Sequence, residues 1–298
     1  MSTPLAADAR LARFAVSRSR RRRDAFARAS ILAGTVIALI PLVLIVYYLL
    51  RTGLGAGSVN FFTTDPTGNT FFGSSGIGGI KSAILGTIEI VALASAIAVP
   101  VGVGVAVWLV EYGRASWFAH TVRFFVDVLT GVPSIVFGLF IYIVLIVGTG
   151  STYAGYKGSV ALSLLMLPIV IRSAEVVLLL VPASLRESAL ALGAPRWRVI
   201  FNIVLPTALP GMLTGVLLAI ARAAGETAPL LFTAAFTQNT NFNLGGFMNS
   251  LPVQIYKDVT SPTTAVVNRA WGAALTLVVM ILLLNLIARL ISRRSRLA

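Results

Sequence analysis

The sequence contains no cysteine and a single histidine, His120, among its 298 residues. The chain therefore forms no disulfide and has no thiolate metal site, and one histidine gives little basis for a histidine metal centre or a serine-type catalytic triad. No segment fits the GxxxxGK[ST] pattern of a P-loop, which excludes that class of nucleotide site. Charged residues make up only 11% of the chain, against about 25% in an ordinary soluble domain.

Apolar residues make up 57% of the chain, and they fall in long runs that show neither period-2 nor amphipathic patterning. Such runs are typical of transmembrane helices, which need roughly 20 predominantly apolar residues each. We therefore expect an all-α membrane protein with six transmembrane helices. The expected spans are 30–50, 82–110, 124–148, 159–182, 207–236 and 271–291.

The net charge of +14 is spread unevenly. If the N-terminus is cytoplasmic, the inner segments hold 17 Lys and Arg and the outer segments five, which is the bias that sets topology. We expect a multi-pass protein of the plasma (inner) membrane with both termini cytoplasmic and basic tails at 1–29 and 292–298. The run SRSRRRR (17–23) is expected to meet anionic lipid headgroups and not nucleic acid. The outer loops 51–80 and 237–270 are rich in Gly, Asn, Thr, Ser and Pro and are expected to be irregular.

Two expected spans carry an Arg–Glu pair at mid-membrane depth, where a charge is costly. Arg172 and Glu175 are three residues apart, and Arg222 and Glu226 are four apart, so each pair lies on one helix face. Each pair can be an internal salt bridge that fixes helix packing. Each can also place a guanidinium on an anion path, because the planar fork donates two hydrogen bonds to an oxyanion. The glutamates would then keep the anion from binding too tightly to leave. The two roles are compatible.

Weaker signals lie in the second, third and fifth spans. Glu89 is expected to face other helices, and Asp127 to lie at the membrane interface near Arg123, which is counted among the inner charges. Gly225 and Pro229 bracket Glu226 and are expected to bend the fifth span. Close helix packing is expected at four glycines: Gly102, Gly104, Gly131 and Gly138.

The segment between the fourth and fifth spans, 184–206, reads SLRESALALGAPRWRVIFNIVLP. It is helical in character, but it breaks at Gly193 and near Pro195. The segment therefore predicts a short helix, a glycine turn and a second segment on the cytoplasmic face. Small residues at 188, 189 and 191 would let a partner approach closely, and Arg186 and Glu187 could fix the register by charge. An interfacial helix that only stabilises the loop is the alternative.

The same segment resembles the binding-protein-dependent ABC importer permeases, whose pattern is E-A-A, three residues, G, nine residues and I-x-L-P. Glu187, Ser188 and Ala189 stand for E-A-A, with Ser188 in place of the middle alanine; Gly193 follows, and the end is I-V-L-P at 203–206. The resemblance implies a type I ABC importer permease fold over 80–291, after a first helix at 30–50. It implies that 184–206 holds the coupling helix that docks on an ATPase subunit. ATP and magnesium would bind that separate subunit, so this chain would be a permease without its own cofactor and not an enzyme.

Two further strings resemble the phosphate-specific importer permeases: LTGVPSIVFGLF at 129–140 and ARAAGETAPLLFTA at 221–234. The second resembles the A-type subunit of that system more than its C-type partner. The resemblance implies that Arg172, Glu175 and Arg222 take part in moving phosphate. It also implies three partners: a homologous permease subunit, an ATPase subunit dimer and an extracytoplasmic phosphate-binding protein. Two alternatives remain open, a permease for sulfate or molybdate and a stand-alone secondary anion transporter, in which the coupling loop would have no purpose.

Overall fold

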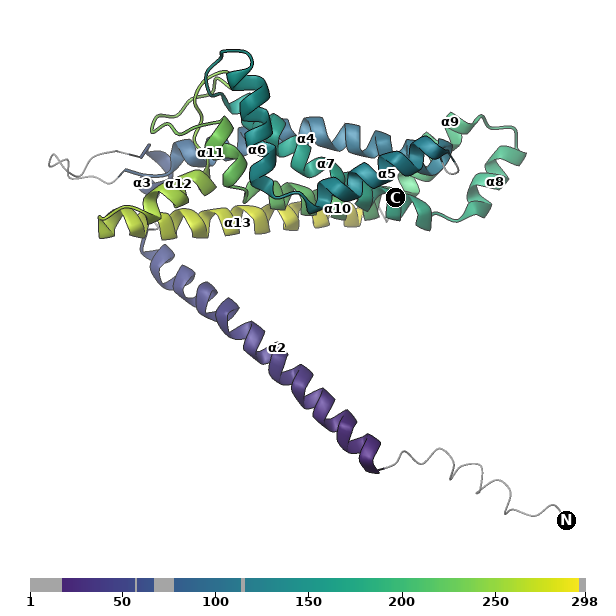
Figure 1. Cartoon of the computed structure of the whole chain (residues 1–298), viewed down its shortest axis with the longest axis horizontal. Coiled ribbons are helices and arrows are strands. Elements are labelled where there is room, and N and C mark those ends of the chain that lie inside the picture. The colour runs from purple at the N-terminus through teal and green to yellow at the C-terminus, as the bar shows by residue number, and fades with distance from the viewer. Residues whose placement is uncertain (1–17, 57, 67–77, 114–115, 295–298) are drawn as a thin grey trace. The chain divides into compact units, whose positions relative to one another are not determined.

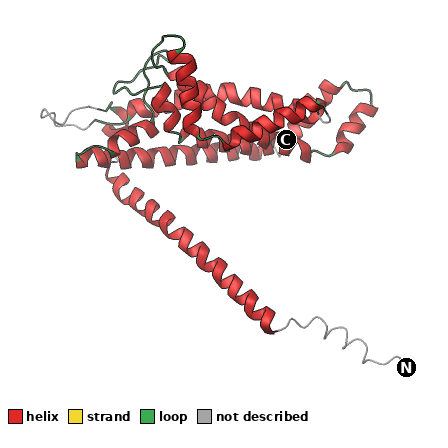
Figure 2. Ribbon diagram, in the orientation of Figure 1, coloured by secondary structure: helices red, strands yellow, loops and turns green. Residues whose placement is uncertain are grey.

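The computed structural model describes residues 18–56, 58–66, 78–113 and 116–294, and over these ranges the chain is built from helices joined by loops (Figure 2). It divides into two compact units, residues 1–51 and 52–298. The bounds are as follows: α2 (Arg18–Gly53), α3 (Val59–Thr63), α4 (Lys81–Val107), α5 (Trp117–Gly131), α6 (Ser134–Tyr142), α7 (Gly155–Leu180), α8 (Ala183–Ala191), α9 (Arg196–Val199), α10 (Leu205–Ala224), α11 (Ala228–Thr233), α12 (Leu251–Val259) and α13 (Thr264–Arg294). The chain also has three π-helical turns. η3 (Trp108–Tyr112) continues α4, and η4 (Ile143–Val147) continues α6. η5 (Ile200–Val204) joins α9 to α10.

In the described residues, five helices are long and apolar enough to cross a membrane, or up to six if one bent pair counts as a single span. The all-α membrane fold is thus confirmed. The first helix begins earlier than the expected span 30–50. α2 starts at Arg18 and so includes the arginines of the basic run. Residues 1–17 of the predicted tail, and 295–298 at the other end, lie outside the described residues.

The third expected span, 124–148, is not one straight helix. α5 ends at Gly131 and α6 begins at Ser134, with a bend of 102° between them. Between the two helices, Val132 has an extended backbone with ψ 130°. The cause is Pro133, since a proline disfavours helical geometry in the residue before it. Residues 124–148 therefore hold a bent pair of helices in place of a single straight one, and α5 forms a separate arm.

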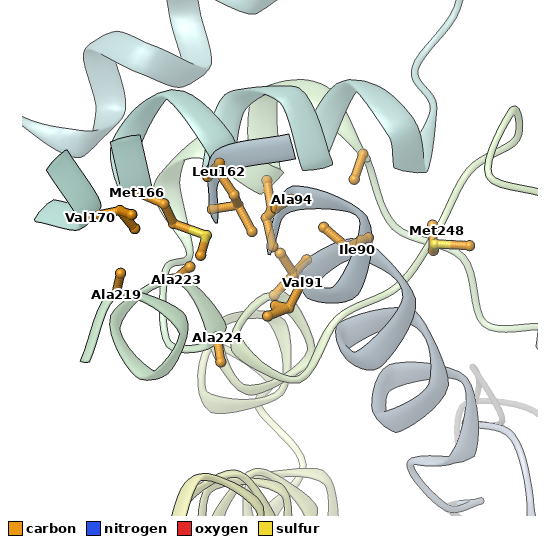
Figure 3. Close-up of a cluster of buried hydrophobic side chains, with 14 residues drawn as sticks. Ile90, Val91, Ala94, Leu162, Met166, Val170, Ala219, Ala223, Ala224 and Met248 are labelled. Carbon is orange, nitrogen blue, oxygen red and sulfur yellow. The ribbon is translucent and has the colours of Figure 1, made fainter. Parts of the chain in front are cut away.

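In the second unit the long helices α4, α7, α10 and α13 run along one direction (Figure 1). α8 and α9 lie at one end of this bundle, and α3, α11 and α12 lie at the other. α4, α7 and α10 meet in a core of mostly small and branched side chains, among them Ala94, Met166, Val170 and Ala223 (Figure 3). Small residues let helix backbones approach closely, which is how helices associate where lipid removes the hydrophobic drive.

The packing glycines divide into two kinds. A Cβ on Gly102 would lie 2.7 Å from Val170 Cγ1, and a Cβ on Gly138 would lie 2.6 Å from Pro229 Cα. These two positions allow α4 to meet α7 and α6 to meet α11, as predicted. A Cβ on Gly104 or Gly131 would meet nothing within 4 Å. The packing prediction was therefore wrong for that second pair within this chain.

The outer loop 237–270 is more ordered than expected. It contains α12, and the N-terminal part of α13 returns from it. A buried ion pair joins Arg269 to Asp258, with Nε 2.7 Å from Oδ2, and Gln254 Nε2 donates to Asp258 Oδ1 at 2.7 Å. The prediction of an irregular cap overlooked the polar groups that these residues pair inside the fold.

Candidate functional site

Helix α7 carries the first predicted charge pair. Arg172 and Glu175 are three residues apart on it, and Arg172 Nη1 donates to Glu175 Oε2 at 2.9 Å. The Glu175 side chain is 5% exposed, whereas that of Arg172 is 35% exposed. The predicted pairing on one helix face is confirmed, and the arginine is its accessible member.

Two residues of the α5 arm complete this pair. Arg123 Nε donates to Glu175 Oε1 at 2.6 Å, so the glutamate gives one oxygen to each arginine. Arg172 Nε donates to Asp127 Oδ1 at 2.8 Å, and its Nη2 donates to the same oxygen. We call these four residues, Arg123, Asp127, Arg172 and Glu175, the four-charge cluster. Two arginines and two carboxylates give it a formal net charge of zero.

The four side chains of the cluster differ in their exposure to solvent. The exposed fraction of the side chain rises from 5% at Glu175 through 23% at Arg123 and 35% at Arg172 to 58% at Asp127. The bond between Arg172 and Asp127 is therefore its accessible edge. A guanidinium held on one side by a buried carboxylate and on the other by an exposed one can exchange the exposed partner for another oxyanion.

Sequence reasoning missed half of the cluster. It counted Arg123 among the inner charges and put Asp127 near Arg123 at the membrane interface, without pairing either residue with α7, to which each of them bonds. A usable signal was present, because Arg123 and Asp127 are four residues apart, the same one-face spacing that marked the other pairs.

The second predicted pair sits at a helix break. Arg222 Nε lies 3.6 Å from Glu226 Oε1, which confirms the pairing. α10 ends at Ala224 and α11 begins at Ala228, so the bend expected in the span 207–236 is a break between two helices. The Arg222 side chain is 54% exposed and that of Glu226 17%. Within the described part of the chain, no hydrogen bond or ion pair joins this pair to the four-charge cluster.

Glu89 of α4 has a different environment. Its Oε2 is buried and has no hydrogen-bond partner within the described ranges. The residue is partly buried, in agreement with the expectation that it faces other helices.

The segment 184–206 folds as a helix, a turn and a second helix. α8 covers Ala183–Ala191, and α9 starts at Arg196 after Pro195. Between them Gly193 has φ +81°, a left-handed conformation that favours glycine. The breaks expected at Gly193 and near Pro195 are confirmed.

The predicted coupling residues face two ways. Glu187, Ser188 and Gly193 are exposed. Arg186 and Ala189 are buried within this chain, at 9% and 8% exposure. The exposed surface therefore offers the charge of Glu187, small groups and three exposed leucines, Leu185, Leu190 and Leu192. A contact of Arg186 or Ala189 with a partner stays a prediction.

Comparison with known proteins gives one family match. Residues 98–297 match the family described as the binding-protein-dependent transport system inner membrane component. A phosphate transport system permease protein PstA of Yersinia pestis is 41% identical over 278 residues, covering 93% of this chain and 92% of that protein. PstA of Haemophilus influenzae is 42% identical over 264 residues, covering 88% of this chain and 91% of that protein.

Solved structures share the fold at low identity. A chain of a bacterial alginate ABC transporter superposes with a TM-score of 0.63 at 17% identity, covering 93% of this chain and 96% of that chain. A chain of the MetNI methionine ABC transporter, in an inward-facing conformation, superposes with a TM-score of 0.59 at 21% identity, covering 72% of this chain and 94% of that chain.

Proposed function

This chain belongs to the binding-protein-dependent transport system inner membrane components. From its similarity to phosphate transport permeases we propose that it imports inorganic phosphate as one permease subunit of an ATP-driven transporter. It is a multi-pass membrane protein and a permease; ATP is hydrolysed by separate ATPase subunits. The observation that carries the phosphate assignment is the 41% identity over nine-tenths of the chain to a protein named as a phosphate transport permease.

Phosphate meets this chain at the open edge of the four-charge cluster. One of its oxygens displaces the Asp127 carboxylate from Arg172, and the planar guanidinium then donates to phosphate as it donated to aspartate. Glu175 keeps hold of Arg172 during the exchange and prevents tight retention of the anion. Arg222, half exposed beside Glu226, is the second guanidinium on the path.

The drive for transport comes from partner chains. A homologous permease subunit of the C type, an ATPase subunit dimer and an extracytoplasmic phosphate-binding protein complete the importer; ATP and magnesium bind to the ATPase, and this chain holds no cofactor. ATP binding closes the ATPase dimer and moves α8 through its exposed residues Glu187 and Ser188 and through Gly193 in the turn that follows. The binding protein then releases phosphate into the outward cavity, and hydrolysis resets the inward state. The concentration of arginine on one side supports cytoplasmic termini in the plasma (inner) membrane, with the basic run 17–23 on anionic lipid.

The assembled complex in liposomes tests both assignments. Arg222→Gln should keep the ATPase bound and hydrolysing ATP but lose most phosphate uptake, whereas Arg51→Gln, at an exposed arginine of α2, should keep uptake. Glu187→Lys should release the ATPase from the membrane, because it reverses the charge on the docking face. Normal uptake by both Arg222→Gln and Glu187→Lys would leave the Arg–Glu pairs as packing elements alone.

Two controls separate the other transporter classes. Uptake that persists without the ATPase subunit would identify a secondary transporter. Inhibition of phosphate uptake by sulfate or molybdate at equal concentration would identify a permease for tetrahedral oxyanions generally, which two guanidinium groups cannot distinguish by charge.

A further inference from the structure

Arg186 lies on α8, but its guanidinium points into this chain. The side chain makes three hydrogen bonds, from Nε to Glu111 Oε1 at 3.0 Å, from Nη1 to the Val181 carbonyl at 2.6 Å and from Nη2 to the Leu178 carbonyl at 2.8 Å. Every donor nitrogen of the fork is thus committed to an acceptor within the chain. The exposed face of α8 is left to other residues.

Two of these acceptors belong to the C-terminal end of α7. The last four carbonyls of a helix have no partner within it, and a cation is favoured at that end by the helix dipole. Arg186 donates a hydrogen bond to the carbonyl of Leu178 in the last turn of α7 and another to the carbonyl of Val181 just past its end. It also brings a positive charge to this end of the helix. Glu175 lies one turn before Leu178 on the same helix. Arg186 therefore fastens α8 to the part of α7 that carries the four-charge cluster.

The third acceptor leads to the cluster by a second route. Glu111 belongs to the π-turn η3, and the carbonyl of Leu109 in the same turn accepts a hydrogen bond from Arg123 Nη2 at 3.1 Å. Arg123 in turn donates to Glu175. Arg186 on α8 is thus connected to Glu175 by polar contacts at Glu111, Leu109 and Arg123, with the backbone of η3 joining the first two of these.

Apolar packing encloses this junction. Val110, Leu178, Val181 and Ala189 are buried in one hydrophobic cluster that joins η3, α7 and α8. The pair of Arg186 and Glu111 is itself mostly buried, with side-chain exposures of 10% and 12%. A charged pair in such surroundings is held firmly, because losing either partner leaves the other charge unpaired away from water.

We propose that Arg186 is a positioning residue that passes the movement of α8 to the four-charge cluster, through the end of α7 and through η3. The inference rests on the proposed function, in which an ATPase moves α8. The fork is suited to this task because its rigid geometry ties three acceptors on two elements at once, which the single ammonium of lysine cannot do. A π-turn can readjust its backbone hydrogen bonds and is often found at functional sites.

The test compares coupling in the assembled complex in liposomes. Arg186→Lys keeps the charge but loses the fork, and we expect the ATPase to stay bound and to keep at least half of its hydrolysis rate while phosphate uptake falls about tenfold. Glu111→Gln should also raise the ratio of ATP hydrolysed to phosphate transported. The rise should be smaller than in Arg186→Lys, because the two bonds from Arg186 to the carbonyls remain. Arg51→Lys, at an exposed arginine of α2, should leave that ratio unchanged.

Three results would overturn the proposal. Loss of the ATPase from the Arg186→Lys complex would make Arg186 a contact with the partner. A proportional fall in hydrolysis and uptake, or no change in either, would make it a purely structural residue.

A second measurement does not depend on phosphate. Hydrogen–deuterium exchange is followed with and without a non-hydrolysable ATP analogue over α8 and over residues 117–131 and 168–180, which hold the cluster. In the native complex the analogue should change exchange in all three segments; in Arg186→Lys it should still change α8 but no longer the other two. Persistence of the nucleotide response around the cluster in Arg186→Lys would refute the relay. If the native complex moves no phosphate, the proposed function fails, and this comparison still decides the role of Arg186.

Discussion

Asp127 and Arg172 are 45 residues apart in the sequence, yet Arg172 Nε donates to Asp127 Oδ1 at 2.8 Å. The bond joins α5 to α7 at the accessible edge of the four-charge cluster. It combines a guanidinium that a second carboxylate already orients with a carboxylate that is more than half exposed. This asymmetry makes Asp127 the partner that an entering oxyanion would replace.

Asp127→Asn should slow phosphate transport without affecting the ATPase. The neutral amide competes less well than the carboxylate for Arg172, so phosphate should stay bound to Arg172 for longer. Uptake at saturating phosphate should therefore fall about fivefold, which is the lower end of the effects that coupling between sites produces. Uptake by reconstituted complexes measures this. Asp24→Asn, the same substitution at an exposed aspartate of α2, serves as control. Faster or unchanged uptake by Asp127→Asn would contradict the exchange.

Glu175→Gln should destabilise the permease strongly. The change leaves two arginines that face a neutral amide, and breaking a buried ion pair costs roughly 3–5 kcal/mol. The midpoint of thermal unfolding in detergent should therefore fall by several degrees. Glu226→Gln is the matched control, because that residue has one arginine partner at 3.6 Å and is more exposed; an equal fall in both variants would argue against the double pairing.

Gly138→Ala should separate α6 from α11. The added Cβ would lie 2.6 Å from Pro229 Cα, a backbone atom that cannot turn aside, and overpacking of this kind costs about 1–3 kcal/mol. The yield of folded permease on size-exclusion chromatography and its thermal midpoint should both drop. Gly131→Ala meets nothing within 4 Å and should behave like the native chain. A stable Gly138→Ala protein would show that the two helices can shift apart at little cost.

Gly193→Val should weaken attachment of the ATPase. Gly193 has φ +81° and open space around its Cα, so the effect comes from the backbone alone and costs about 1–2 kcal/mol. Gly193→Asn should retain most of the attachment, since asparagine tolerates the left-handed region far better than a β-branched residue. The measurement is the amount of ATPase that co-purifies with each variant. Equal attachment of the two would mean that the turn does not set the docking surface.

Local spacing predicted the parts of this fold that depend on one helix. The i,i+3 and i,i+4 pairs formed, and the glycine and proline signals of 184–206 marked the ends of α8 and α9. An apolar run, in contrast, looks the same whether the helix is straight or bent. Pro133 was the one local signal for the 102° bend, and it was passed over. The break after Ala224 was partly foreseen from Gly225 and Pro229.

The spacing of residues along the sequence did not predict the contacts between helices. Arg123 and Glu175 are 52 residues apart, and nothing in their spacing brings them together. The same holds for Arg186 and Glu111, which are 75 residues apart. The sequence analysis also expected the charge of Arg186 to fix the register of a partner, whereas the packing of α8 on α7 and η3 directs its donors into this chain.

The zero formal charge of the four-charge cluster has an electrical consequence. A membrane potential acts on net charge, at about 2.3 kcal/mol per elementary charge per 100 mV, so the voltage across the membrane exerts no net pull on the cluster as a unit. In the proposed exchange, phosphate replaces Asp127 on Arg172, so the site would gain negative charge and an inside-negative voltage would oppose the inward passage of the anion. Import by this route should become harder as the membrane hyperpolarises, and the ATP-driven movement of the helices has to overcome that opposing voltage.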